Sequence, residues 1–238
     1  MSAKAHATAA ELDRAPVDGS VRDPTLRFVR RAAPALGAGL LLSFSSSFGQ
    51  TFFLSLFGGV WREAFDLSHG AFGALYAVAT LSSAVCLLAV GKTVDHVPPS
   101  RIALILLVLT ALAALWLSSA ANVLALGAGL FAMRVLGQGL LSHLAMTTVA
   151  KWFDDARGRA LGIAMLGFPI GEAMLPVAAA SAMATFGWRA VWLGVAAFAA
   201  FALAPAIVLL AARAERATHP TDRKAASARR DEPPSWTR

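Results

Sequence analysis

Long apolar segments alternate with short polar loops through the middle of the chain. Each segment is about as long as the roughly 20 apolar residues with which an α-helix crosses the hydrocarbon core of a bilayer. The alternating strands of about ten residues that build membrane barrels do not occur in the sequence. The pattern therefore predicts an all-α polytopic membrane protein with six transmembrane helices, over residues 33–57, 71–91, 102–119, 123–149, 160–184 and 190–211.

The composition agrees with this prediction. Hydrophobic residues make up 57% of the chain and charged residues only 15%, whereas soluble domains carry about 25% charged residues. Most of the charges lie in residues 1–32 and 212–238, which contain little to bury and are predicted to be disordered cytoplasmic tails. The first apolar segment is longer than the roughly 7–15-residue core of a cleaved signal peptide, so we expect it to remain as the first span.

Lysine and arginine residues predict the orientation in the membrane. Of the 21 such residues, 18 lie in the two tails and in loops 92–101 and 151–159, on one predicted side. Only Arg62 and Arg189 lie on the other side, and Arg134 lies within a span. Because basic residues gather on the cytoplasmic side, we expect a multi-pass protein of the cell inner membrane with both termini in the cytoplasm. The basic residues belong to no folded domain, so no nucleic-acid partner is expected.

Arg134 is the most costly residue in this pattern. At about 1.5 Å per residue it lies roughly 17 Å deep, near mid-membrane, where an arginine costs about 2.5–3.5 kcal/mol on insertion scales. Glu172, the only acidic residue inside any predicted span, lies at a similar depth. We therefore expect the two residues to pair or to share a water-filled cavity. Glu172 would then carry protons and Arg134 would hold an anion, or the two would form a fixed ion pair that joins two helices.

Two stripes of polar residues accompany this arginine, one in the first span and one in the fourth. Residues three, four or seven positions apart lie on one face of a helix, and in lipid such polar faces turn toward protein or water. The stripes consist of Ser43, Ser46 and Gln50 in the first span, and of Gln138 and Ser142 behind Arg134 in the fourth. They either line a substrate path or form hydrogen bonds between helices.

The fifth predicted span contains "GFPIGEAMLP", which combines two glycines with two prolines. Gly167 and Gly171 permit the close approach of another helix, and Pro169 and Pro176 free backbone carbonyl groups. The segment is either a kinked packing helix or a gating hinge.

Residues that would mark an enzyme do not occur in the sequence. Cys86 is the only cysteine, so an intrachain disulfide and a cysteine-based metal site are excluded. There is no phosphate-binding loop or dinucleotide fingerprint, and no Gly-x-Ser sequence of the kind that intramembrane serine proteases use. We therefore expect no enzyme activity and no cofactor.

The loops resemble those of the major facilitator superfamily. "GKTVDHVPPSR", with Gly91, Asp95 and Arg101, is similar to the signature loop of that superfamily, and its "PPSR" part is weakly similar to monocarboxylate-type members. "AKWFDDARGRALG", with Arg157 and Arg159, resembles the second cytoplasmic loop. "FGWRAVW" at the start of the sixth span, and Arg134 followed by two glycines, also resemble superfamily motifs.

The resemblance implies one half of a twelve-helix fold, built from two three-helix inverted repeats. Members bind their solute between two halves, and Asp95 would contact the other half; alternatively it caps its own loop or pairs with Arg101 or Arg157. Arg159 belongs to the same set of conformational loop residues. The expected partners are the bilayer, a small-molecule substrate, and a second six-helix half or a second copy of the chain. We expect a symporter or antiporter of a small organic solute, with an organic anion favoured; the alternative is a truncated or non-transporting structural membrane protein.

Overall fold

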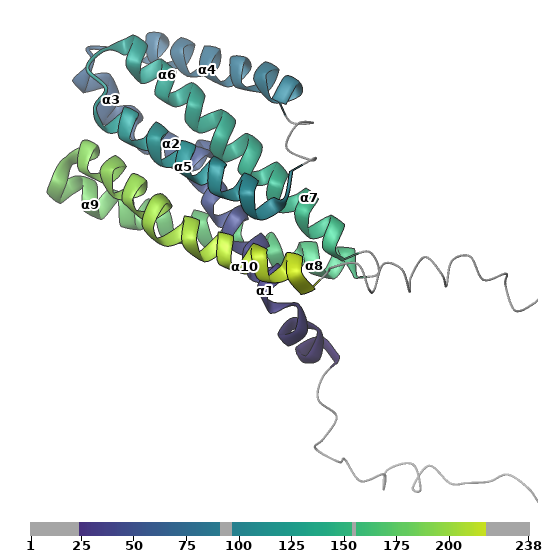
Figure 1. Ribbon diagram of the computed structural model, residues 1–238. Coiled ribbons are helices and arrows are strands. Elements are labelled where there is room, and N and C mark those ends of the chain that lie inside the picture. Colours follow the sequence, from purple (N-terminus) through teal and green to yellow (C-terminus); the bar gives the residue numbers. More distant parts are fainter. Residues whose placement is uncertain (1–23, 91–96, 154–155, 218–238) are drawn as a thin grey trace, which may run out of the picture. The chain divides into compact units, whose positions relative to one another are not determined.

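The computed structural model describes residues 24–90, 97–153 and 156–217, and these residues are helical apart from short turns (Figure 1). Residues 24–33 form a unit separate from residues 34–217, and the contacts given below lie within the second unit. The helical elements are α1 (Pro24–Ser46), η2 (Ser47–Gly49), α2 (Thr51–Ser55), α3 (Gly58–Ala64), α4 (His69–Val90), α5 (Pro99–Ser118), α6 (Val123–Met133), η4 (Arg134–Leu141), α7 (Ser142–Trp152), α8 (Arg157–Ala164), α9 (Gly167–Ala197), η5 (Phe198–Leu203) and α10 (Ala204–Ala217).

Five helical stretches of the described chain are long and apolar enough to cross a membrane. Four of them, Ala32–Ser55, His69–Val90, Pro99–Ser118 and Val123–Trp152, correspond to the first four predicted spans. The last, Arg157–Ala217, is 61 residues long and contains the predicted fifth and sixth spans together. The predicted all-helical membrane fold is confirmed, whereas six separate helices are not distinguished.

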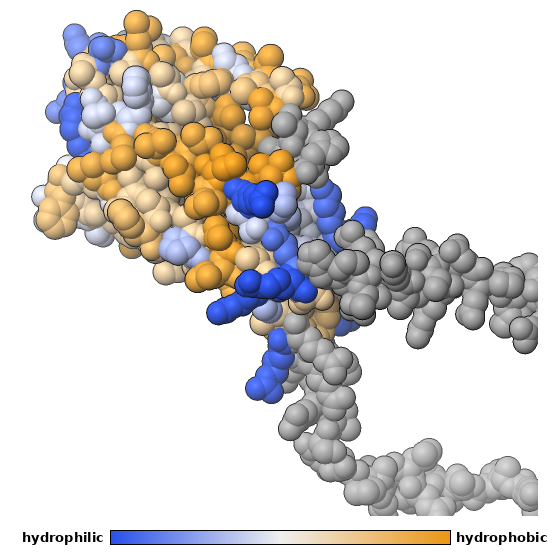
Figure 2. All heavy atoms as spheres, viewed as in Figure 1, coloured by the Kyte–Doolittle hydropathy of each residue, from blue (hydrophilic) through white to orange (hydrophobic). Residues whose placement is uncertain are grey.

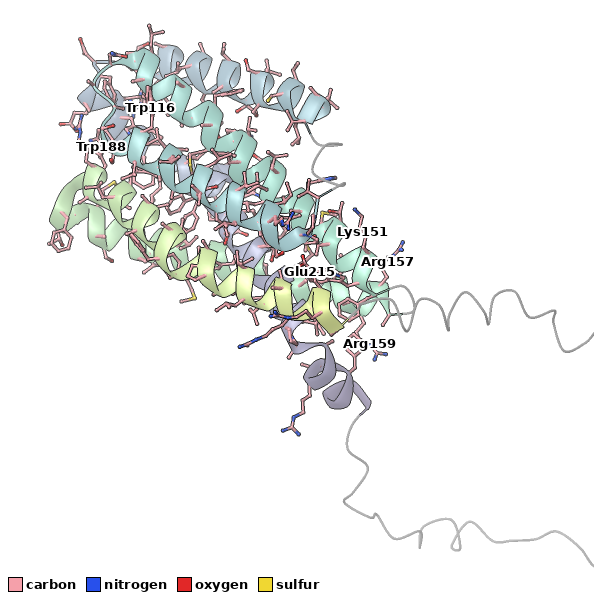
Figure 3. All side chains as sticks on the ribbon, viewed as in Figure 1. Trp116, Lys151, Arg157, Arg159, Trp188 and Glu215 are labelled. Atoms are coloured by element: carbon pink, nitrogen blue, oxygen red, sulfur yellow. The ribbon has the colours of Figure 1, made fainter. Side chains whose placement is uncertain are left out.

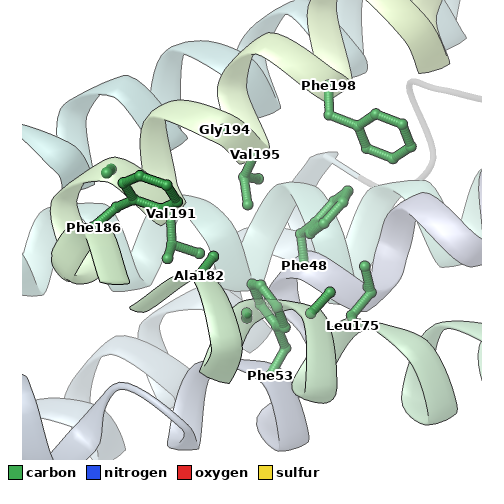
Figure 4. A pocket seen from close by; sticks show the side chains of 12 residues that line it. Phe48, Phe53, Leu175, Ala182, Phe186, Val191, Gly194, Val195 and Phe198 are labelled. Carbon is green, nitrogen blue, oxygen red and sulfur yellow. The ribbon is translucent and has the colours of Figure 1, made fainter. Parts of the chain in front are cut away.

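The chain reverses its direction within this last stretch, at Gly187. Leu175 and Phe198 line the same pocket (Figure 4), although a straight helix would place them about 34 Å apart. Gly187 has φ 79° and ψ 164°, a backbone conformation that essentially only glycine adopts. Glycine therefore permits the turn between an arm of residues 167–186 and an arm that begins at residue 188.

The two residues after the turn attach it to the end of α5. The guanidinium of Arg189 lies 4.2 Å from the centre of the Trp188 ring, and its Nη2 donates a hydrogen bond of 2.9 Å to the carbonyl oxygen of Ala120. This carbonyl follows the last turn of α5, where backbone acceptors lack helical partners. The "FGWR" sequence thus combines a glycine that permits the turn with an arginine that fixes it.

α5 lies at the centre of the packing, in contact with α6, η4, α9, η5 and α10, while α4 packs on α6 and η4. Small residues make close helix contacts possible in lipid, and α5 buries four alanines. Its opposite face exposes large apolar side chains. The buried alanines are Ala103, Ala111, Ala113 and Ala114, and the exposed residues include Leu104, Ile105, Val108 and Leu112. Figure 2 shows the resulting apolar surface over α5 and α10.

Each of the two predicted tails overlaps a helix of the described structure. α1 starts at Pro24 and α10 continues through Ala217, so residues 24–32 and 212–217 are helical, contrary to the prediction of disorder for them. Residues 24–32 contain three arginines, and residues 212–217 contain three alanines and two arginines, all of which are good helix formers. The remaining tail residues, together with Gly91 and Asp95, lie outside the described residues.

Replacement of Gly187 by alanine tests the turn. A side chain at this φ is strained, so Gly187→Ala should lower the free energy of unfolding by about 1–3 kcal/mol, measured as a lower thermal midpoint of the protein in detergent. Gly194→Ala is the matched control, because Gly194 lies in the regular helix and an added Cβ would meet no atom within 4 Å. Equal midpoints for the two variants would show that the turn does not depend on glycine.

Candidate functional site

The first membrane-spanning stretch is interrupted near its middle. α1 ends at Ser46, a 3₁₀ turn covers Ser47–Gly49, and Gln50 is extended, with φ −74° and ψ 153°, before α2 begins. The fourth span also departs from α-helical geometry, because Arg134–Leu141 forms a π-helical segment. Such π segments occur frequently at functional sites.

The two irregular segments contact each other through glycines. A Cβ on Gly137 would lie 2.6 Å from both N and Cα of Gly49. In the other direction, a Cβ on Gly49 would overlap the carbonyl oxygen of Met133 and lie 2.6 Å from the backbone N of Gln138. Because the obstructing atoms belong to the main chain, no side-chain movement relieves the overlap. Both positions therefore require glycine.

Arg134 lies beside this crossing and joins three helices. It is 7% exposed, and its Nη1 donates to Oγ1 of Thr51 at 3.0 Å, with the carbonyl oxygen of Gly49 at 3.5 Å. Its guanidinium carbon lies 5.4 Å from the centre of the Tyr76 ring on α4, within range of a cation–π contact. Its Nε is buried and has no hydrogen-bond partner among the described residues.

The expected pairing of Arg134 with Glu172 is not present. Arg134 contacts span one and α4, whereas Glu172 is exposed on α9 and makes no hydrogen bond or ion pair with a described residue. The prediction assumed that spans four and five lie side by side along their length. Instead, contact between them is concentrated in α7 and α8, and the arm that carries Glu172 then packs through Gly171 on Ser47 of span one.

The serines of the first span contribute to helix packing. Oγ of Ser43 lies 2.6 Å from the carbonyl oxygen of Ala164 and 2.9 Å from that of Leu40, and Ser46 donates to Ser43 O in its own helix at 2.7 Å. Both serines are fully buried. Gly167 packs so closely on this region that an added Cβ would overlap Ser43 Oγ. Ser43 therefore forms a hydrogen bond between helices, which is one of the two possibilities left open by the sequence. Ser46 bonds within its own helix.

Several residues of α4 and span four carry buried polar atoms without hydrogen-bond partners among the described residues. We call Tyr76, Thr80, Arg134, Gln138 and Ser142 the polar cluster. Each contributes one buried atom that has no hydrogen-bond partner among the described residues: the hydroxyl oxygens of Tyr76, Thr80 and Ser142, Nε of Arg134 and Oε1 of Gln138. Gln50, at the break in span one, is partly exposed. The cluster offers both donors and acceptors in a region from which bulk water is excluded.

Three residues near Arg134 or in the polar cluster were not foreseen from the sequence. Thr51 accepts a hydrogen bond from Arg134, and Tyr76 and Thr80 belong to the polar cluster. Tyr76 and Thr80 are isolated neutral polar residues in an apolar segment, which gives little signal, whereas Thr51 directly follows Gln50 at the end of the polar stripe of span one. Tyr76 and Thr80 are four positions apart and share a helix face, and Tyr76 is the only tyrosine in the chain. That spacing could have indicated a third polar stripe opposite the one on span four.

The described loop residues lie at one end of the bundle, away from the polar cluster. Arg101 is exposed at the start of α5, and Arg157 and Arg159 are exposed on α8; Figure 3 shows the latter two near Lys151. At the same end, the backbone N and Oγ of Ser100 donate to the carboxylate of Glu215 at 2.7 and 2.8 Å. This contact holds the beginning of α5 against α10 and was not foreseen from the sequence.

A separate pocket of about 230 Å³ lies between the two arms around Gly187 (Figure 4). Phe48, Phe53, Phe186 and Phe198 contribute to its walls, and every lining residue is apolar. Ligand sites usually combine an apolar wall with a few polar groups that orient the ligand. A polar solute would find no such group here, so the polar cluster is the better candidate site. Among the described residues, no group of three His, Cys, Asp or Glu could hold a metal ion.

Comparisons with known proteins indicate the family of the chain. The sequence model of the Major Facilitator Superfamily matches residues 39–238. A riboflavin transporter, RibJ of Trypanosoma cruzi strain CL Brener, is 31% identical over 125 residues, which amount to 52% of this chain and 26% of that relative. The match thus spans about a quarter of the relative's length. No solved structure matches the chain at a comparable level of significance.

The glycine crossing can be tested by one methyl group. Gly137→Ala places a Cβ against the backbone of Gly49, and overpacking of this kind costs about 1–3 kcal/mol, so the thermal midpoint in detergent should fall. Gly162→Ala is the matched control, because a Cβ there would meet nothing within 4 Å. If Gly137→Ala is as stable as Gly162→Ala, the two spans are not in main-chain contact.

Proposed function

Because the chain belongs to the major facilitator superfamily, we propose that it is a secondary transporter of a small organic solute with Arg134 at the centre of its solute site. The observation that carries this proposal is the environment of Arg134. The arginine is buried in a membrane span, its described partners are all neutral, and its Nε has no partner. A cation in this state has a large electrostatic attraction for an anionic group.

The polar cluster supports a solute that carries an anionic group and further hydrogen-bonding atoms. Arginine binds carboxylates through parallel N–H donors. Gln138 and Ser142 follow Arg134 on the same span and would offer further hydrogen bonds. Gln50 would offer another, because it directly precedes Thr51 at the break in span one. Ser43 and Ser46 are not proposed to contact the solute, because their hydroxyl groups bond to backbone carbonyl oxygens. Riboflavin, which the relative named above transports, is the second solute to test; it is uncharged and would use the hydrogen-bonding groups more than the charge.

We further propose that the described helices form the N-terminal half of a transporter, as two three-helix inverted repeats. The reversal at Gly187 supports the division of the last stretch into a fifth and a sixth span. A second half, or a second copy of the chain, would cover the face that carries Glu172. The exposure of Glu172 supports this, because an acidic side chain in contact with lipid at mid-membrane is costly.

Glu172 is then the proposed proton carrier of a symporter or antiporter, since a carboxyl group in a water-filled cavity can bind and release protons during a transport cycle. The loop residues Gly91, Asp95, Arg101, Arg157 and Arg159 are proposed to contact the other half as the protein changes conformation. The basic residues at one end of the described helices support an orientation with both termini in the cytoplasm, and a location in the inner membrane.

Substitution of Arg134 tests the solute site. In proteoliposomes that contain the full chain, Arg134→Gln should weaken binding and uptake of a short-chain monocarboxylate about 10- to 100-fold, because hydrogen bonds to charged groups contribute about 1.5–3 kcal/mol. Arg134→Lys should retain part of the activity. Arg62→Gln, which removes a partly exposed arginine at the end of α3 that contacts His69 at 3.0 Å, is the control for net charge.

Three results would distinguish the readings of this experiment. Monocarboxylate uptake that is insensitive to Arg134→Gln contradicts the anion site. Uptake of riboflavin that is likewise insensitive would favour a neutral solute held elsewhere. Binding without uptake would favour a second half that must be supplied from another polypeptide.

Substitution of Glu172 tests the coupling. Glu172→Gln keeps the size of the side chain but removes its ability to exchange a proton, so solute exchange should persist while stimulation of uptake by an imposed pH gradient is lost. Glu63→Gln, an exposed acidic residue of α3, is the matched control. An unchanged response of Glu172→Gln to the gradient would exclude this glutamate as the proton carrier.

A further inference from the structure

Two apolar stripes on neighbouring helices end at arginines. On α5, large exposed apolar side chains recur at helical spacing from Leu104 to Leu115, with Leu104 45% exposed and Leu112 54% exposed. Arg101, also exposed, lies one turn before Leu104 on the same face. The apolar side chains of this stripe can contact lipid acyl chains, and the arginine at its end can contact a lipid headgroup.

The neighbouring helix repeats this arrangement. Phe201 is 83% exposed and Leu209 is 55% exposed, and exposed Arg213 and Arg216 follow at the end of α10. Residues 209, 213 and 216 are separated by four and three positions, so they share one face of the helix. α5 and α10 pack against each other, so both stripes belong to one pair of packed helices.

A pair of hydrogen bonds fixes the arginine-bearing ends of these helices together. Ser100 donates from its backbone N and its Oγ to the two oxygens of Glu215 at 2.7 and 2.8 Å. Arg101 directly follows Ser100, and Arg216 directly follows Glu215. None of Arg101, Arg213 and Arg216 makes a hydrogen bond or ion pair with a described residue. Figure 2 shows hydrophilic side chains at these helix ends, directly bordering the apolar surface of α5 and α10.

We propose that this face binds an anionic phospholipid. Its phosphate would lie across Arg101, Arg213 and Arg216, and its acyl chains would follow the stripes on α5 and α10. Guanidinium groups match phosphate oxygens in geometry and charge, and long arginine side chains at a membrane boundary extend toward the headgroups. Anionic lipids concentrate at the cytoplasmic surface, where the excess of basic residues places this end of the helices.

The test uses the full chain in a neutral detergent and measures its thermal stabilisation during titration with dioleoyl phosphatidylglycerol or dioleoyl phosphatidylcholine. The wild-type protein should be stabilised at lower concentrations of phosphatidylglycerol. Each of Arg213→Gln and Arg216→Gln should weaken this apparent affinity about fivefold, and the triple variant with Arg101→Gln about a hundredfold, from the contribution of each basic residue near an anionic surface. All titrations use one salt concentration, because salt screens exposed basic residues at the site and elsewhere alike.

Arg62→Gln is the control for net charge, because it removes one partly exposed positive charge on α3, away from the ends of α5 and α10 that carry the three arginines. An equal loss of affinity in Arg62→Gln, or an unchanged preference for phosphatidylglycerol in the single variants, would overturn the proposal. Stabilisation of the same size by inorganic phosphate would also overturn it, because the site would then recognise phosphate without the lipid. If the triple variant does not fold, the single variants decide the question. Arg216→Lys should then retain most of the preference for phosphatidylglycerol, and Arg216→Gln should not.

Discussion

The main-chain contact between Gly49 and Gly137 is the constraint on which the rest of the bundle depends. Regular helical geometry is lost on both sides of this contact, as a 3₁₀ turn and an extended residue in span one and as a π segment in span four. Interrupted helices leave backbone groups that lipid cannot satisfy. Arg134, which belongs to the π segment, reaches across the crossing to Thr51 and toward Gly49, so the arginine that sequence analysis found costly is also a bridge between the two interrupted spans.

The same contacts explain why Arg134 remains chemically available. A buried guanidinium that is paired with a carboxylate is neutralised and gains little from a further anion. Here its described partners are a hydroxyl, a distant carbonyl and the face of an aromatic ring. These groups solvate the charge and hold the side chain in place without cancelling the charge. The proposal of an anionic solute rests on this uncancelled charge.

The sequence predicted those features that depend on local composition, and it failed where helix packing decides. Length and hydropathy located the first four spans to within a few residues, and the cost of a charge in lipid singled out Arg134. Depth in the membrane and a short loop did not establish which helix faces Arg134, because the arm that carries Glu172 packs on span one through Gly167 and Gly171. The bonds of Ser100 with Glu215 join residues 115 positions apart, and no local pattern indicates such a contact. The turn at Gly187 was visible as "FGWR", but its positive φ was not.

Exposed side chains in this bundle belong to two classes, and the chemistry of the side chain separates them. Leucine and isoleucine on α5, exposed to about half of their surface, gain free energy from contact with acyl chains and need no other partner. An exposed carboxylate at the same depth loses free energy in that environment. Glu172 and the leucines of α5 therefore cannot face the same medium in a working protein. The face that carries Glu172 is therefore a poorer surface for lipid than the face of α5 that carries the leucines.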